Sequence, residues 1–389
     1  MSRRASTTLM VAALLCGNTA FAEDEPIDHK IPPGYEPEEA RDERGLWMEL
    51  EELERGINKS ALLVRDPDIN DYVNEIVCRV AGEYCNDFRV YVIRNPGFNA
   101  SMTATGMMQI WTGLIVRANS TDEIAAVVGH EIAHYTRLHS LQRLRAIKTK
   151  MASGSIFDLA VVLATGVSTP LGQMTAMMSV LSFNREQETE ADLLGTRLLA
   201  EASYDPHASY EVWQRIIAEE EAAAVKREEP SVFSKTHPAS DQRAAYLERL
   251  VNTTYGPPDA ERVADEKLID ILDKHYLFLM EDQLDTNRFG RTEEMLNRHR
   301  ELGVEASHVY FFYGEMFRQR NEEGDQQLAM DAYRHSIEAG KAPAGVYKNL
   351  GYLHLKNGDT VAAQVQFRKY LEIDPVADDR AMIEFYLEE

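Results

Sequence analysis

The sequence is short of positive charge. Its 389 residues hold 41 lysines and arginines against 64 aspartates and glutamates, which gives a net charge of −23 at pH 7. A protein that binds nucleic acid needs a basic patch, and docking on anionic lipid by charge needs the same sign. The composition therefore argues against both functions. It favours solubility and says little about substrate.

Long hydrophobic runs are also missing. Residues 155–181 are apolar overall, but their uninterrupted part, 159–165, is far shorter than the roughly 20 residues that a membrane-spanning helix needs. We expect a buried or membrane-touching helical hairpin over 155–181, which includes peripheral contact with a membrane. A membrane-embedded enzyme is disfavoured for the same reason.

Cysteine is scarce, with three residues in the chain, and one of them lies in a segment with the features of a secretory signal. Two arginines stand near the start, residues 8–16 are apolar, and Ala20-Phe21-Ala22 is a small-x-small cleavage site. We expect 1–22 to be a signal peptide, so that the mature protein is secreted. A lipoprotein would use Cys16 as its anchor, but Leu15 stands where a small residue is needed.

Removal of the signal leaves one cysteine pair, Cys78 and Cys85. An even pair can form a disulfide in an oxidising compartment. On one straight helix the two residues would share a face but lie about 10 Å apart, too far to bond. Gly82 could break the helix between them. A disulfide and two buried thiols therefore both stay open.

The chain divides into segments of different composition. Residues 23–43 are rich in proline and acid and predict a flexible lead-in. A Pro/Gly-bearing stretch near 252–259 predicts a boundary between a first domain over 44–255 and a second over 264–389. Alternation of apolar and polar residues predicts a strand at 88–93, and a second strand is expected at 106–111. Residues 113–118 lead into a helix that begins at 120 and continues past 134. The other expected helices lie at 46–58, 67–81, 184–202, 268–283, 292–302, 308–320, 327–339, 344–357 and 361–373.

The central helix is the best-defined element and carries the chemistry. It begins with a capping-box pattern at 120–123 and continues into His130-Glu131-Ile132-Ala133-His134, an HExxH motif. Residues i and i+4 share a helical face, so both imidazoles can bind one Zn²⁺ per chain. Glu131 then lies beside the metal, where it can take a proton from a metal-bound water. The alternative is two surface histidines, but the apolar neighbours predict a buried helix whose polar groups need partners.

A catalytic zinc wants a third protein ligand. The metzincin arrangement would place glycine at 137 and histidine at 140; this sequence has Arg137 and Ser140, and His139 is one residue off. A later helix offers the other common solution, because Glu188 and Asp192 share a face. Glu188 could bind zinc, and Asp192 could hydrogen-bond a ligand histidine. From composition alone, a solvated acidic face is the favoured alternative.

These motifs resemble those of metallopeptidase family forty-eight, which includes the CAAX prenyl proteases. The resemblance lies in Val128-Gly129-His130-Glu131-Ile132-Ala133-His134 followed by Glu188-x-x-Ala191-Asp192. It implies a mainly α fold, in which a zincin-type α+β metalloprotease domain with a small sheet precedes a helical domain. It also implies that Glu188 is the third zinc ligand, which reverses the preference above.

Two further stretches match the same family. Asn99-Ala100 followed by Gly106 resembles its substrate-binding edge strand, although Ser101-Met102-Thr103 departs from the usual loop. We expect substrate to add by backbone pairing to an edge strand near 106–111. His237-Pro238 with Arg243 resembles an element that folds back over the site. There the resemblance implies that His237 steadies the oxyanion or caps the zinc, and that Arg243 orients nearby groups.

The C-terminal helices predict tetratricopeptide repeats. The spacing of small and aromatic residues fits that repeat in one helix pair and, with about three extra residues at a turn, in the pair before it. These residues are Tyr347, Leu350, Gly351, Ala363, Phe367 and Pro375, preceded by Tyr310, Tyr313, Gly314, Phe317, Ala329 and Tyr333. Small residues permit close helix approach while aromatics fill the gaps. A plain helical bundle is the alternative, and either array offers a groove for peptide.

A signal peptide, this protease core and these repeats together resemble the family's periplasmic members that serve outer-membrane assembly. The resemblance implies an endopeptidase for quality control of misfolded or unassembled envelope proteins. Its repeats would bind unfolded substrates or the outer-membrane assembly machinery. The alternative is a repeat-based chaperone or scaffold whose metal site is silent or latched. Proteolysis released by His237→Ala would separate the two.

Overall fold

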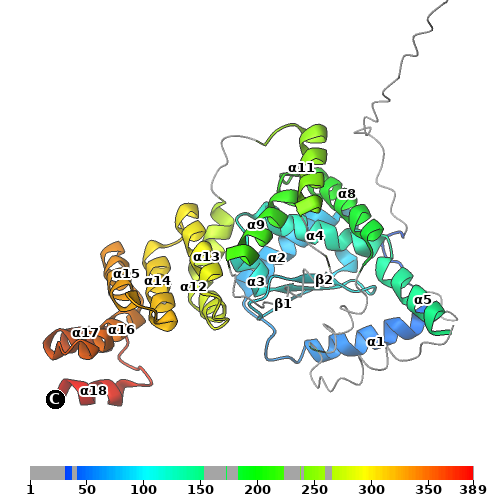
Figure 1. Ribbon diagram of the computed structural model, residues 1–389. Coiled ribbons are helices and arrows are strands. Elements are labelled where there is room, and N and C mark those ends of the chain that lie inside the picture. Colours follow the sequence, from blue (N-terminus) through cyan, green and yellow to red (C-terminus); the bar gives the residue numbers. More distant parts are fainter. Residues whose placement is uncertain are drawn as a thin grey trace, which may run out of the picture.

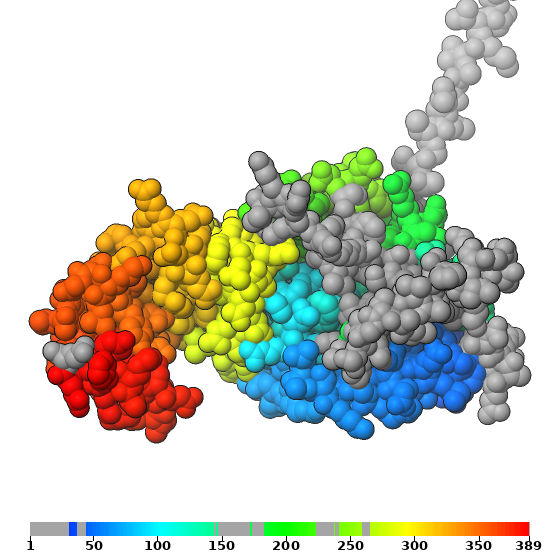
Figure 2. Space-filling view, turned by 60° about the horizontal axis from the view of Figure 1, so that its bottom comes forward, coloured from blue at the N-terminus to red at the C-terminus, as the bar shows by residue number. Residues whose placement is uncertain are grey.

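The computed structural model describes residues 31–36, 42–152, 172, 183–222, 237, 241–258 and 265–388. The expected signal peptide at 1–22 lies outside these residues, and so does the hairpin at 155–181 apart from residue 172. The chain forms a domain around a small sheet, and a row of helices extends from one side of it (Figures 1 and 2). The predicted mainly α fold with a small sheet is confirmed.

The sheet has three strands in the order β1-β3-β2: β1 (Arg89–Ile93), β2 (Ala100–Met102) and β3 (Met107–Trp111). β3 pairs parallel with β1 and antiparallel with β2, and all five of its residues are buried. The expectation that substrate adds to an edge strand at 106–111 is therefore wrong, because both sides of β3 are already paired. The edge strand beside it is β2, which the alternation pattern missed because it has three residues.

Helices cover both faces of the sheet (Figure 1). The upper face carries the large core, to which most helices of this domain contribute, while α1 and Leu141 of α5 pack on the opposite face around Trp111 and Met107. These helices are α1 (Asp42–Ile57), α2 (Pro67–Ala81), α3 (Thr112–Arg117), α4 (Thr121–Thr136), α5 (His139–Ala152), α8 (Arg185–Glu201), α9 (Ala208–Ala222) and α11 (Asp241–Tyr255).

Helix α4 is buried along most of its length, from Glu123 to Thr136, and crosses α8 at two glycines. A Cβ atom on Gly195 would lie 2.9 Å from the backbone nitrogen of His130, and one on Gly129 would lie 3.0 Å from the carbonyl oxygen of Gly195. Such distances are too short for side chains, so glycine permits this close crossing. At the start of α4, Ser120 caps Glu123 as expected, but Glu123 accepts from the backbone N–H of Asn119 rather than of Ser120.

The N-terminal segment and the cysteines differ from the simplest expectations. Residues 31–36 lie against the domain: Tyr84 donates to the carbonyl oxygen of Ile31, and the backbone N–H of Gly34 donates to Asp87. For these residues the lead-in is packed rather than flexible. Cys78 and Cys85 form a disulfide with Cα atoms 4.6 Å apart. The pair can meet because α2 ends at Gly82, whose φ of 56° lets the chain fold back.

The second region is entirely helical. Its helices are α12 (Glu266–Leu284), α13 (Phe289–Leu302), α14 (Ala306–Arg320), α15 (Asp325–Ala339), α16 (Ala344–Lys356), α17 (Thr360–Ile373) and α18 (Arg380–Glu388). α14 packs against α15, and α16 against α17. The ring of Tyr333 fills the space beside Gly314, and the ring of Phe367 fills the space beside Gly351, as the repeat spacing predicts. The assignment of these helix pairs as tetratricopeptide repeats stays a prediction.

A buried cluster of five charged residues, the junction network, joins the two regions. It consists of Arg117, Glu123, Arg215, Glu219 and Arg298. Glu219 pairs with Arg117 of α3 and with Arg298 of α13, and its side chain is fully buried. Outside the network, Arg94 forms a bidentate pair with Asp282 of α12. The helical region is thus fastened to the first domain by buried and exposed ion pairs.

Among the helices that the structure describes, none is both long enough and apolar enough to cross a bilayer.

Candidate metal centre

Four buried side chains converge above the edge strand. α4 supplies His130 and His134, α8 supplies Glu188, and His237 comes from the chain before α11. One ligand atom from each residue lies within 4.8 Å of the other three. His134 Nε2 is 3.0 Å from His130 Nε2, and His237 Nδ1 is 3.1 Å from the same atom and 3.0 Å from Glu188 Oε1. Two imidazoles and a carboxylate are a donor set typical of zinc.

Asp192 and Arg243 support this cluster from behind. Asp192 Oδ1 is 3.1 Å from Nδ1 of His130, the ring nitrogen on the side away from His134. Arg243 donates to Asp192 from Nε at 2.7 Å and from Nη2 at 2.6 Å, and its Nη1 lies 2.8 Å from Glu188 Oε2. The guanidinium lies 4.0 Å from the ring centroid of Trp213. One arginine therefore holds Glu188 and Asp192 of α8 in place.

Glu131 lies beside the four donors. Its side chain is 1% exposed, and Oε2 accepts a hydrogen bond of 3.1 Å from the backbone N–H of Met102 in β2. Oε1 lies 3.3 Å from His237 Nε2 but accepts no hydrogen bond from the described residues. A buried carboxylate oxygen that accepts no hydrogen bond can take a proton or accept a hydrogen bond from a water.

Burial and mutual charge shift the pKa values of the site in different directions. Burial disfavours the charged form of His130, but hydrogen bonds to Asp192 and Glu188 raise its pKa to about 9. Burial lowers the pKa of His134 well below its usual range. Burial raises the pKa of Glu131. Glu188 is also buried, but its histidine neighbours lower its pKa. Such divergent shifts in one place are a mark of functional sites.

The charge of the cluster fits a divalent cation. Three carboxylates (Glu131, Glu188 and Asp192) face one guanidinium, that of Arg243, among the described residues. A histidine that binds a metal is neutral, so in the metal-binding state the group carries two negative charges in excess, whereas protonated His130 offsets one of them when no metal is bound. Buried charges need partners, and a Zn²⁺ ion carries the charge that would balance them.

The structure brings most of the predicted residues together. His130, His134, Glu188 and His237 form the cluster, and Asp192 with Arg243 borders it. Ala100 lies in edge strand β2, and the carbonyl oxygen of Asn99 pairs with the backbone N–H of Trp111. Gly106 lies elsewhere, in the turn before β3, where its φ of 78° favours glycine and its α-carbon packs on Asp87. It is placed to shape the sheet rather than to contact the four donors.

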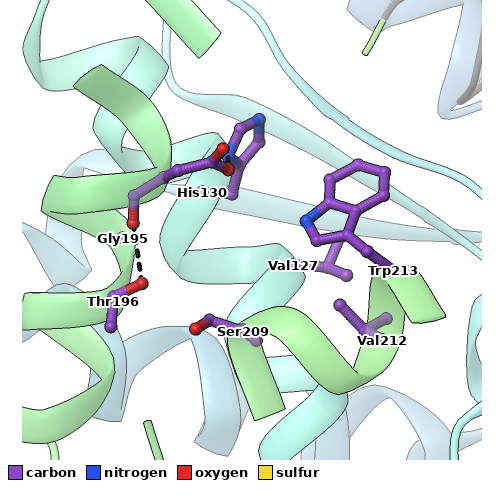
Figure 3. Close-up of a pocket in the computed structure, with 9 residues that line it drawn as sticks. Val127, His130, Gly195, Thr196, Ser209, Val212 and Trp213 are labelled. Atoms are coloured by element: carbon purple, nitrogen blue, oxygen red, sulfur yellow. Dashed lines mark hydrogen bonds and ion pairs between the residues drawn. The ribbon is translucent and has the colours of Figure 1, made fainter. Parts of the chain in front are cut away.

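Sequence reasoning missed three neighbours of the cluster. The ring of Phe183 stacks on that of His134 with centroids 3.7 Å apart. Trp213 borders the site, and Figure 3 shows it at a small pocket of about 20 Å³ beside His130, between α4, α8 and α9. His139 lies 2.9 Å from His134. Of these three residues, only His139 is marked in the sequence, where it lies one position before the third histidine of the metzincin pattern.

Comparison with known proteins agrees with this geometry. Residues 64–251 match the family model of peptidase family M48. The chain is 30% identical over 184 residues to the mitochondrial metalloendopeptidase OMA1 of Schizosaccharomyces pombe, covering 46% of this chain and 51% of that protein. It is 26% identical over 216 residues to the beta-barrel assembly-enhancing protease of Yersinia pestis, covering 53% and 44%. For the Escherichia coli protein of that name the values are 25% over 208 residues, 51% and 42%. The matched part spans about half the length of these relatives.

Proposed function

Because the chain contains a domain of peptidase family M48, we propose that it is a zinc-dependent endopeptidase. The observation that carries the proposal is the meeting of four buried ligand atoms within 4.8 Å of one another. His130, His134 and Glu188 would hold one Zn²⁺ per chain. When bound, the ion supplies a water of lowered pKa and polarises the scissile carbonyl.

Glu131 is the general base in this proposal. Its free oxygen faces the cluster, and burial raises its pKa toward the range in which a carboxylate can both take and return a proton. It takes the proton of the attacking water and hands it to the leaving amine. The backbone N–H of Met102 fixes the other oxygen, so the base keeps one orientation.

Substrate adds to β2, not to β3. β2 is the edge strand, it lies next to α4, and its Met102 already contacts Glu131. The N–H of Met102 is donated to Glu131, so an extended peptide would pair with Ala100 and with the carbonyl oxygen of Met102, and would pass the general base there. Asn99 anchors the start of this strand.

His237 closes the site at rest. Its Nδ1 is within 3.1 Å of both His130 Nε2 and Glu188 Oε1, so it stands where a substrate or water would bind. It must move before catalysis, and once displaced it can steady the developing oxyanion. Arg243 orients Glu188 and Asp192 throughout. The same closure supports the second candidate, a repeat-based chaperone or scaffold with a latent metal site.

The relatives' names and the sequence support a proposal for the cellular role. The beta-barrel assembly-enhancing proteases and the predicted signal peptide at 1–22 support a periplasmic enzyme. Its substrates would be misfolded or unassembled outer-membrane proteins, and its helices over 264–389 would bind them or the assembly machinery. Peripheral membrane contact through 155–181 completes the proposal.

The test separates metal binding from catalysis. Glu131→Gln should retain zinc but lose cleavage of an unfolded protein substrate, because the amide cannot take a proton. Zinc content is measured by elemental analysis and cleavage by gel electrophoresis. Full activity of this variant refutes the mechanism. His237→Ala should raise proteolysis above that of the unmodified protein, whereas a scaffold stays inert after either change.

A further inference from the structure

Beyond the zinc ligands, we propose that His139 is a positioning residue. It fixes the ring of His134 in the tautomer that presents Nε2 to the metal, and Glu190 in turn orients His139. The ring of His139 is fully buried, and its Nδ1 lies 2.9 Å from Nδ1 of His134. On its other side, Nε2 of His139 lies 3.2 Å from Glu190 Oε2. This inference rests on the proposed zinc site.

The direction of these hydrogen bonds follows from the chemistry of imidazole. A neutral ring carries one N–H, and its other nitrogen is an acceptor or a ligand. His134 Nε2 lies among the candidate ligands, 3.0 Å from His130 Nε2 and 3.5 Å from Glu188 Oε1. The proton of His134 therefore belongs on Nδ1, where it is donated to His139. His139 then carries its own proton on Nε2 and donates it to the carboxylate.

The local backbone places His139 for this contact. α4 ends at Thr136, and Leu138 has a φ of 57°, a left-handed conformation that a bulky residue rarely adopts. This turn starts α5 at His139 and directs the new ring back against the last turn of α4. Phe183 stacks on the face of His134 with the rings 17° from parallel. His134 is thus held by a ring on its face and by a hydrogen bond at its far nitrogen.

The two ligand histidines therefore have different supports. His130 contacts Asp192, which is buried and held by Arg243. Metal-bound histidines usually donate their second N–H to such a carboxylate or to a carbonyl, and loss of that partner costs 10–100-fold in metal affinity or activity. His134 instead reaches its carboxylate through a second imidazole. That carboxylate, Glu190, is 38% exposed and also pairs with Arg137 at 3.0 Å.

The decisive experiment uses the full chain without metal. Nitrogen-15 labelling of histidine and NMR should show His134 as a single tautomer with its proton on Nδ1. His139→Phe, which keeps the ring volume but removes both nitrogens, should give a mixture of tautomers. His139→Gln, which keeps an acceptor and a donor, should restore the single tautomer. His299→Phe serves as the control, since His299 is equally buried but lies in α13.

Zinc affinity provides the second readout. Competition with a chelator should show zinc binding weakened about 10–100-fold in His139→Phe, less in Glu190→Ala, and little in His139→Gln or His299→Phe. If His139→Phe does not fold, Glu190→Ala carries the test, because its side chain is partly exposed. An unchanged tautomer of His134 in a folded variant without the His139 hydrogen bonds overturns the proposal.

The two readouts keep this inference separate from the proposed function. If the unmodified protein binds no zinc, the enzymatic proposal fails, but the tautomer of His134 in the metal-free protein still decides the role of His139. If the protein binds zinc but the tautomer of His134 does not depend on His139, the enzymatic proposal is retained and the positioning role of His139 is refuted.

Discussion

The metal centre and the junction network are both buried clusters of opposite charges, yet they are balanced differently. In the junction network three arginines surround two glutamates, and each member pairs with another. In the metal centre three carboxylates face one arginine. Every charge of the first cluster has a partner within the protein, and the second has excess negative charge once its ligand histidines are neutral. The comparison teaches that the sign of the imbalance, rather than burial or the number of charges, distinguishes a structural ion network from a site for a cation.

The strongest test of this comparison removes one carboxylate from each cluster. Glu219→Ala should lower the free energy of unfolding by about 3–5 kcal/mol, because it leaves buried arginines without a partner. Glu188→Gln should lose zinc, and its metal-free form should lose less stability than Glu219→Ala does, because the glutamine keeps the shape of the side chain and Arg243 still pairs with Asp192. Urea unfolding with and without a chelator, together with zinc analysis, measures both. Equal losses of stability in the two metal-free variants would erase the distinction.

The second-largest expected effect is the pH dependence of stability through His299, which lies next to Arg298 of the junction network. His299 accepts from Tyr276 on one side and donates to the carbonyl oxygen of Val116 on the other, and burial lowers its pKa to about 4. The unfolded chain binds its proton near pH 6.5, so stability from this group is complete above pH 6.5 and is lost as pH falls toward 4. The difference amounts to about 3 kcal/mol.

His299→Gln keeps a donor and an acceptor but cannot titrate. Unfolding free energies at pH 7, 5 and 4 should therefore fall less steeply for this variant than for the unmodified protein, although Arg298 and Glu219 still contribute their own charge. Parallel pH profiles would show that His299 does not carry the predicted dependence.

The smallest effect concerns the crossing of α4 and α8. Gly195→Ala should force the helices apart, because the new Cβ would meet backbone of α4 at 2.9 Å. We expect a loss of about 1–3 kcal/mol and zinc affinity weakened on the order of tenfold. Gly45→Ala is the matched control: it lies in α1 with no atom within 4 Å of its Cβ, so stability should stay equal or rise slightly. Normal zinc affinity in Gly195→Ala would show that the crossing does not set the ligand geometry.

The sequence predicted the features that depend on local patterns. The helix at 67–81 and the strands at 88–93 and 106–111 appear within a residue or so of their expected bounds, because apolar periodicity records which face is buried. The HExxH spacing placed two imidazoles on one face. Glu188 needed the family resemblance, because an acidic helix face alone does not reveal what it packs against.

The remaining features depend on contacts between distant segments. Strand order is set by tertiary pairing, so nothing in 106–111 could reveal that β3 is central and β2 is the edge. The disulfide depended on how far α2 unwinds at Gly82, a choice that spacing left open. Contacts between the two regions join residues far apart in the sequence, as in the hydrogen bond between His299 and Val116, which are 183 positions apart.

The fastening of α12 has a mechanical consequence. Gln283 donates to the carbonyl oxygen of Pro96, and Asp282 pairs with Arg94, so α12 is bonded to the loop that leads into β2. The row of helices behind α12 (Figure 2) is therefore held at a fixed offset from the edge strand. Under the proposed function, the helical array would bind a substrate chain at a fixed distance from the general base. The position of cleavage would then depend on its distance along the substrate from the bound segment, rather than on the identity of the side chains at that position.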